Sequence, residues 1–172
     1  ALTKMTTVNG LAIHYSYDSL MRLTKKDIEG TVLETYTYAD GAGEGYTSTQ
    51  VATKSVTAHG NEVRDYSYTY DPLGNIATVN ESVTGTSTTY TYDNAGNILS
   101  RREYAYTTGE LGEVLDTVVY TYGDDSWGDL LTNYDGQTLS YDTVGNVLTD
   151  GTWTYTWEHG RQLASMTGNG AT

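Results

Sequence analysis

The sequence contains no cysteine and no phenylalanine, and a single proline among its 172 residues. Without cysteine there is no disulfide framework and no thiol chemistry. No apolar run approaches the length of a membrane span, and no signal peptide opens the chain. These absences leave the compartment open, because the chain begins with Ala1 rather than Met. We expect a segment of a longer protein.

Basic residues are also scarce. Nine Lys and Arg stand against 22 Asp and Glu, for a net charge of −13. This balance argues against nucleic acid as a partner, because phosphates need a basic footprint. It also argues against docking on anionic lipid or insertion into a membrane. The acidic residues are spread through predicted turns, where their simplest role is to keep the chain soluble and to discourage edge-to-edge association.

What the chain has in quantity is tyrosine (17 residues) and glycine (19), beside three tryptophans. A phrase ending in Tyr-Asp recurs at residues 15–18, 68–71, 90–93 and 139–142, with degenerate copies at 36–39, 120–123 and 155–158. Three copies continue into Gly-Asn and an aliphatic residue, at 74–76, 96–98 and 145–147. Self-similarity at a period of roughly 20–50 residues indicates a repeat architecture.

Alternation of residue types predicts strands. In residues 66–70 and 88–92 the tyrosines fall at every second position, with Ser or Thr between them. Successive side chains of a strand point to opposite faces, so tyrosine lines one face and the small polar residues the other. No stretch has helical periodicity over three turns, and residues 20–28, the nearest approach, align with a strand in the other copies.

The turns are equally legible. Residues 71–74 read Asp-Pro-Leu-Gly, which predicts a type I turn with glycine in a left-handed bulge position; 93–96 and 142–145 fit the same template. The Asp-Gly pairs at 135–136 and 150–151 predict two-residue hairpins. Longer loops are expected at 39–45, 107–113 and 123–128. The fold class that follows is all-β, a continuous antiparallel meander of short strands.

These residues resemble the YD repeat, also called the RHS repeat. The stretches Tyr70 to Ile76 and Tyr92 to Leu99 carry the pattern almost fully, and Tyr141 to Leu148 is as good. Tyr17-Asp18 keeps the opening but has Met21-Arg22 where Gly-Asn or Gly-Arg would stand. The likeness runs from about Ile13 to Met166. It implies one array over residues 1–172, with about seven β-hairpin units and no internal domain boundary, forming an open, curved or spiral strip.

The resemblance also implies a function. Bacterial members enclose a C-terminal toxin in a shell of such repeats, and the usual setting is secreted or at the cell surface. We therefore expect a non-catalytic structural segment of the β-shell or stalk of a larger bacterial RHS/YD-repeat protein. Its expected partners are the neighbouring repeats, an enclosed toxin domain, and another copy through edge-to-edge self-association.

Candidates for chemistry are weaker. His14, His59 and His159 have no metal-ligand spacing. The acidic residues Asp65, Glu110, Glu113 and the pair Asp124-Asp125 do not define a glycosidase cleft. The loop 123–129 has carboxylates that suit Ca²⁺ but lacks the order of a calcium loop. We expect no enzyme activity, no cofactor and no metal, so no catalytic, cofactor-binding or metal-ligating residue is assigned.

The alternative function is a carbohydrate- or protein-binding surface module. Trp127 in its loop, or Trp153 with Tyr155 and Trp157, can form an amphipathic aromatic platform beside acidic loops. Against this, residues 153, 155 and 157 alternate as the tyrosine face of a diverged repeat does. The two interpretations differ in whether these rings are exposed or packed.

Overall fold

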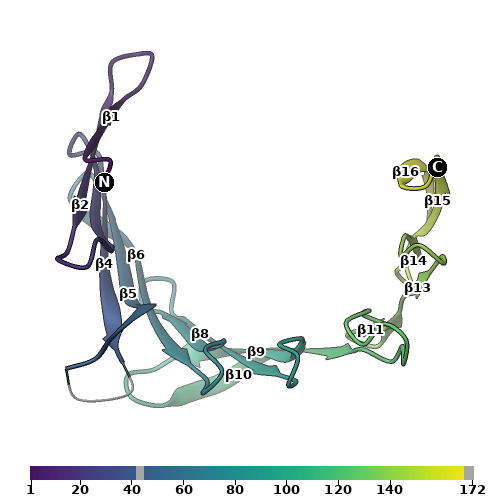
Figure 1. Cartoon of the computed structure of the whole chain (residues 1–172). Coiled ribbons are helices and arrows are strands. Elements are labelled where there is room, and N and C mark those ends of the chain that lie inside the picture. Colours follow the sequence, from purple (N-terminus) through teal and green to yellow (C-terminus); the bar gives the residue numbers. More distant parts are fainter. Residues whose placement is uncertain (42–44, 169–172) are drawn as a thin grey trace. The chain divides into compact units, whose positions relative to one another are not determined.

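The computed structural model describes residues 1–41 and 45–168 (Figure 1), and within them it contains strands and no helix. Sixteen strands follow one another along the chain. They are β1 Lys4–Thr6, β2 Ala12–Tyr17, β3 Leu23–Ile28, β4 Val32–Asp40, β5 Thr47–Ala58, β6 Asn61–Tyr70, β7 Ile76–Glu81, β8 Thr86–Tyr92, β9 Ile98–Tyr106, β10 Leu111–Thr121, β11 Asn133–Tyr134, β12 Gln137–Thr138, β13 Ser140–Tyr141, β14 Val147–Thr149, β15 Thr154–Glu158 and β16 Gln162–Thr167. In these ranges no helix is long and apolar enough to cross a membrane.

The strands form an open antiparallel meander, which confirms the all-β prediction. β1 to β12 make one sheet in chain order, and β13 to β16 make a second sheet in chain order. The two are joined by residues 137–141, whose first part pairs with β11 and whose last part pairs with β14. The amide of Leu139 donates to the carbonyl of Thr132, so the hydrogen-bonded run continues past the end of β12.

The chain divides into two compact units. The first holds Ala1–Tyr90 with Arg102–Asp116, and the second holds Thr91–Arg101 with Thr117–Thr172. In both units, neighbouring strands pair in sequence order, as hairpin repeats require. A single array without an internal domain boundary stays a prediction.

Exposure alternates along the strands as expected. In β6, Tyr68 and Tyr70 are half-buried while Thr69 between them is exposed. The rings of Tyr66 and Tyr68 stack with their centroids 6.2 Å apart. Full burial is rare: the buried hydrophobic residues of the described ranges are Ala12, Ile13, Tyr104 and Val118. The tyrosine face is therefore half-buried rather than fully enclosed, which suits a side chain with an apolar body and a polar tip.

The predicted hairpins divide into one success and one failure. Asp135 and Gly136 both have positive φ (49° and 83°) and join the paired residues Tyr134 and Gln137, as a two-residue type I′ turn does. The prediction for residues 150–151 is wrong, because Thr149 pairs with Thr154 across a four-residue loop. There the Asp150 carboxylate accepts bonds from two loop amides and from the Tyr155 hydroxyl, which stabilises the longer connection.

The three predicted long loops differ in outcome. The stretch 107–113 is shorter than expected, since β10 already begins at Leu111. Residues 123–128 lie outside any strand, as predicted. Of the loop 39–45, β4 includes residues 39 and 40, and residues 42–44 lie outside the described residues.

Replacing Met21 by glycine should stabilise the protein. Met21 has φ of 64° and is 60% exposed, and it stands where three other turns carry glycine. A non-glycine residue in the left-handed region costs about 1–2 kcal/mol of folding free energy. Glycine removes this cost, but its greater freedom in the unfolded chain offsets roughly half of the benefit. We therefore expect the free energy of unfolding to rise by about 0.5–1 kcal/mol. Urea denaturation measures it. Leu20→Gly, at the preceding exposed position without positive φ, is the control and should destabilise instead.

Candidate functional site

The Tyr-Asp turn is a closed hydrogen-bond unit that repeats four times. In each copy the Asp Oδ1 accepts the amides two and four residues later, at 2.8–2.9 Å. The amide three residues later donates to the Asp carbonyl, and the Asp amide donates to the carbonyl four residues later. The four aspartates are Asp18, Asp71, Asp93 and Asp142. Their carboxylates thus organise the turn, as predicted for an Asp-initiated turn.

The fifth residue of the turn reaches in two directions. Asn146 Nδ2 donates to Asp142 Oδ2 at 2.7 Å and to the carbonyl of Gly160, in the following hairpin, at 2.6 Å. Asn97 does the same, with Asp93 Oδ2 at 2.9 Å and the carbonyl of Gly128 at 3.3 Å. This side chain therefore ties its own turn to a later unit.

Arg22 performs the same task in the first complete copy. Its Nε donates to Asp18 Oδ2 at 2.6 Å, and its Nη1 donates to the carbonyl of Ser48 at 2.5 Å. The guanidinium also lies 4.4 Å from the centre of the Tyr38 ring, a cation–π distance. Met21-Arg22 thus replaces Gly-Asn in sequence while keeping its geometry.

In five copies of the phrase, the second aromatic residue bonds its unit to an earlier segment of the chain. Its hydroxyl donates to a backbone carbonyl at 2.7–2.9 Å in four copies: Tyr17 to Leu2, Tyr38 to Leu23, Tyr70 to Val51 and Tyr141 to Leu131. In the degenerate copy at residues 155–158, Trp157 stands at this position, and its indole Nε1 donates to the carbonyl of Val147 at 2.7 Å. An aromatic ring with a donor at its tip is what these copies share.

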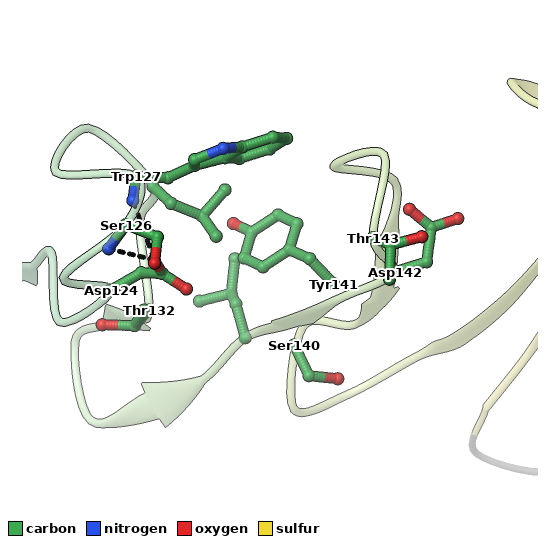
Figure 2. Close-up of a pocket in the computed structure, with 10 residues that line it drawn as sticks. Asp124, Ser126, Trp127, Thr132, Ser140, Tyr141, Asp142 and Thr143 are labelled. Carbon is green, nitrogen blue, oxygen red and sulfur yellow. Dashed lines mark hydrogen bonds between the residues drawn. The ribbon is translucent and has the colours of Figure 1, made fainter.

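A hollow with a volume of about 290 Å³ lies against Trp127 (Figure 2). We call it the Trp127 hollow. Trp127, Tyr141, Asp124 and Asp142 are among the residues that line it, and Figure 2 shows the Asp142 carboxylate turned away from the two rings. Trp127 is 44% exposed, whereas Tyr141 is half-buried and holds its hydroxyl on Leu131. An exposed indole near the Asp124 carboxylate suits an amphipathic polar ligand.

Trp127 also packs on the repeat. A Cβ built on Gly145 would lie 2.6 Å from Cζ3 of the Trp127 ring, so the indole lies directly on the turn glycine. The loop that carries it is held by Asp124, whose Oδ1 accepts the amides of Ser126 and Trp127 at 2.8 Å. With the bond from Asn97 to Gly128, the loop contacts two turns, at Asp93 and at Asp142.

The other predicted aromatic candidates pack into the sheet. Trp153, Tyr155 and Trp157 are half-buried, while Thr154 and Thr156 between them are exposed. The Tyr155 hydroxyl donates to Asp150 Oδ2 at 2.7 Å. Their alternation therefore fits the diverged tyrosine face rather than an exposed platform.

A charged network lies on the tyrosine face of β3, β4 and β5. The Glu34 carboxylate accepts the Tyr36 hydroxyl at 2.5 Å and pairs with Lys26 at 3.0 Å and Lys54 at 3.4 Å. The hydroxyl bond and the two ammonium groups lower the pKa of Glu34 to about 2. Burial, and then the bond to Glu34, raises the pKa of the Tyr36 hydroxyl. Sequence reasoning missed this network, although its members face one another across adjacent strands.

The three histidines lie in separate elements of the described ranges. His14 lies in β2, His59 in the β5–β6 turn and His159 in the β15–β16 turn, and all three are exposed. Within the described residues there is no group of three or more His, Asp or Glu placed to hold a metal ion.

The acidic residues near the strands have structural partners instead. Asp65 accepts the Ser82 hydroxyl at 3.0 Å, and its amide donates to the buried Glu81. Glu81 in turn accepts the amides of Val83 and Thr84, so it caps the β7–β8 turn. Of the other acidic candidates, Glu110 directly precedes β10, Glu113 lies near its start, and Asp125 is exposed in its loop.

A further copy of the turn was missed at residues 7–11. Thr7 takes the place of Asp: its Oγ1 accepts the Leu11 amide at 3.0 Å, and its carbonyl accepts the Gly10 amide at 2.9 Å. Gly10 has φ of 88°. The spacing from Thr7 to Gly10 equals that from Asp71 to Gly74, and this spacing is the signal that could have revealed the turn.

Acid should weaken the repeats through their turn aspartates. Hydrogen bonds from the turn amides and from Asn or Arg side chains hold the pKa of Asp18, Asp71, Asp93 and Asp142 below the ordinary value of 3.8. A carboxylate with a lowered folded pKa stabilises fully above 3.8, and that contribution is lost as pH falls through the folded pKa. We expect Tm, followed by far-UV circular dichroism, to drop steeply below about pH 4.

An isosteric pair of variants tests that assignment. Asp71→Asn should lower Tm at pH 7 and flatten its fall between pH 5 and pH 2.5, because one titrating turn is removed. Asp125→Asn removes an exposed acid outside the turns and should leave the slope unchanged. Equal slopes for Asp71→Asn and the unmodified protein would contradict the role of the turn carboxylate.

Comparison with known proteins identifies the repeat. The family model RHS Repeat matches residues 70–108, which contain the turns at Asp71 and Asp93. No curated protein matches the chain.

Solved structures give distant similarities. The Tc holotoxin pore of Photorhabdus luminescens with a TccC3 mutation is 12% identical, with a TM-score of 0.39, over 100% of this chain and 13% of that one. A TcdB2–TccC3 crystal structure is 13% identical, with a TM-score of 0.40, over 93% of this chain and 11% of that one. The TcdB2–TccC3–TEV structure is 13% identical, with a TM-score of 0.37, over 92% and 12%.

This chain thus spans about an eighth of the length of the solved chains that it resembles. What carries the identification is the matched segment, together with the turn geometry it shares with the rest of the sequence. The hydrogen bonds of Asp71 and Asp93 inside residues 70–108 recur outside them at Asp18 and Asp142. Residues 70–108 are thus similar to the RHS repeat, and the Tyr-Asp turn of that segment recurs at Asp18 and Asp142.

Proposed function

We propose that this segment is a non-catalytic part of the wall of a β-shell, or of a stalk, in a larger secreted or surface bacterial RHS/YD-repeat protein. One observation carries the proposal: the recurring polar groups of the repeat are hydrogen-bonded within the fold. Asp142 Oδ1 holds the amides of its turn, and the Tyr141 hydroxyl holds the carbonyl of Leu131. Groups so engaged build a wall and are not available as acid, base or nucleophile.

The proposed placement in a toxin-enclosing shell rests on the family resemblance. Bacterial RHS proteins enclose a toxin, so the partners proposed for this segment are its neighbouring repeats and an enclosed C-terminal domain. The hydrogen bonds that Arg22, Asn97 and Asn146 donate to later repeats support a continuous wall, because each bond fixes one repeat on a following one.

The test uses the parent protein. Its gene should continue the Tyr-Asp repeats on at least one side of this segment and then change to an unrelated C-terminal domain. In limited proteolysis of the purified parent protein, a closed shell should protect the C-terminal domain from cleavage at neutral pH. Cleavage of that domain should begin only when acid unfolds the repeats. Cleavage of the C-terminal domain at neutral pH, with the repeats still intact, would favour the stalk. A parent without further repeats would overturn both.

A second candidate function, a glycan- or protein-binding surface, is favoured by the Trp127 hollow. Trp127 is 44% exposed in this hollow, which Asp124 also lines, and an exposed indole suits a sugar ring through stacking. Titration of the isolated chain with a panel of soluble oligosaccharides, followed by tryptophan fluorescence, tests it. Trp127→Ala should abolish a saturable change, and Tyr46→Ala, which removes another exposed ring, should not. No saturable change with any oligosaccharide would reject the glycan form.

A further inference from the structure

The Trp127 hollow is small and is built by the second compact unit. The residues that line it fall between Asp124 and Thr143, and so within that unit. Its volume of about 290 Å³ is at the lower end for ligand pockets, which run from about 300 to 1,000 Å³. The hollow therefore fits one small group of a ligand.

Aromatic and aliphatic side chains form much of its wall. Figure 2 shows the Trp127 indole above the Tyr141 ring, and the half-buried Leu130 and Leu139 also line the space. The indole is held in place because it lies on Gly145. A ring that is fixed before the ligand arrives loses little freedom when the ligand binds.

Four of the polar side chains that line the hollow already bond to the fold. The Tyr141 hydroxyl donates to the carbonyl of Leu131, and the Thr132 hydroxyl bonds to two backbone groups. Both oxygens of Asp142 accept bonds from its own turn, and Asp124 Oδ1 accepts two loop amides. A ligand that must donate hydrogen bonds would compete with these contacts, and giving up water without new hydrogen bonds is costly.

The surface around the hollow is acidic. The second unit holds eight Asp and Glu residues against two Arg. Of these arginines, Arg101 lies in β9 and Arg161 donates to the carbonyl of Val144. Neither of these described residues lines the hollow, whereas Asp124 does. A cation is therefore attracted to this surface and an anion is repelled.

A rigid aromatic hollow in an acidic surface, with its polar groups engaged, suits a cation that has no N–H donors. Quaternary ammonium groups are such cations, and they bind on the faces of aromatic rings, with tryptophan the best of these. A primary ammonium is instead a strongly hydrated point charge that needs acceptors. We propose that the Trp127 hollow binds a trimethylammonium group of the kind that choline carries, with the methyl groups against the Trp127 indole. This inference rests on the second candidate function, in which the hollow is a binding surface, and names its ligand.

The experiment titrates the whole chain with choline and follows its amide NMR signals. The signals of residues 126–127 and 143–144 should shift and saturate. Two matched ligands test the chemistry: a neutral isostere of choline, in which carbon replaces the charged nitrogen, and ethanolamine, which carries a primary ammonium. Both should bind at least about tenfold more weakly than choline. Affinity for either that equals the affinity for choline would overturn the proposal.

Two isosteric variants distinguish the hollow from general attraction. Asp124→Asn keeps an oxygen that can accept the loop amides and removes the charge, so choline binding should weaken about fivefold. Asp125→Asn removes the neighbouring exposed acid, which is screened by solvent, and should leave binding within about twofold. Trp127→Leu should abolish the saturable shifts, and circular dichroism checks that each variant folds. Equal weakening by the two asparagine variants would overturn the proposal.

Titration with neutral oligosaccharides separates this inference from the function on which it rests. Saturable binding of an oligosaccharide without binding of choline would keep the binding surface and overturn the trimethylammonium ligand. If neither binds, the binding surface and its proposed ligand are both overturned. Binding of choline alone, with shifts confined to the hollow, would support the inference.

Discussion

Asn146→Ala should lower the free energy of unfolding by about 2–3 kcal/mol, because it removes two hydrogen bonds from a buried side chain. Asn146 is 7% exposed and donates to the Asp142 carboxylate at 2.7 Å and to the Gly160 carbonyl at 2.6 Å. Alanine leaves both acceptors without this donor. Urea denaturation at pH 7 measures the loss. The slope with urea must be compared as well, since repeat arrays can lose two-state behaviour.

Two other turns provide matched controls. Asn75 bonds to its own Asp71 at 2.9 Å, and in the described ranges it has no second partner. Asn97 has a long second bond of 3.3 Å to Gly128. The order of destabilisation should therefore be Asn146→Ala, then Asn97→Ala, then Asn75→Ala, with about 1 kcal/mol between the extremes. Equal losses at all three would contradict a contribution from the inter-unit bond.

The local parts of this fold follow from the sequence because their determinants are close together. Asp71 and Gly74 lie within one turn, and the amides that Asp71 binds are two and four residues away. The alternation of Tyr68, Thr69 and Tyr70 fixes which face each side chain takes. Interactions of this range need no knowledge of the rest of the chain.

The carbonyl groups that the fifth turn residue reaches in a later repeat could not be predicted from the sequence. Nothing near Asn97 in sequence indicates Gly128, which lies 31 residues later. Arg22 reaches Ser48 across a spacing of 26 residues. Such contacts depend on strand register and on the path of the intervening loop, so they appear only when the sheet is assembled. The Trp127 hollow is of this kind too, since its walls come from a loop and from the strand of a later repeat.

The wrong hairpin prediction and the missed turn have a common physical cause. In both, a side chain forms the hydrogen bonds that decide the turn, in place of the residue or turn type that is usually preferred. At residues 150–151 the Asp-Gly pair suggests a tight turn, but the Asp150 carboxylate binds the amides of Thr152 and Trp153 and holds a longer loop. At residue 7 a threonine hydroxyl does what aspartate does elsewhere. Turn preferences of single residue types do not predict these cases, since a hydroxyl and a carboxylate can both accept a hydrogen bond from the same backbone amide.

Gly145→Ala should be strongly destabilising, at about 2–4 kcal/mol. Two effects combine at this position. Gly145 has φ of 85°, where an L side chain costs about 1–2 kcal/mol. The added Cβ would also lie 2.6 Å from Trp127 Cζ3 and 3.0 Å from Cη2, so the indole must leave the turn that it covers. Thermal and urea unfolding both measure the loss.

Gly160→Ala separates the two effects, because Gly160 has nearly the same φ, 87°, with no atom within 4 Å of the added Cβ. It should show only the backbone cost. The double variant Trp127→Ala with Gly145→Ala completes a cycle: without the indole, the alanine at 145 should cost no more than the alanine at 160. If Gly145→Ala and Gly160→Ala are equally destabilising in the presence of Trp127, the indole does not hold the turn. The loop 123–129 would then be an insertion between repeats that the bond from Asn97 to Gly128 still ties to the Asp93 turn.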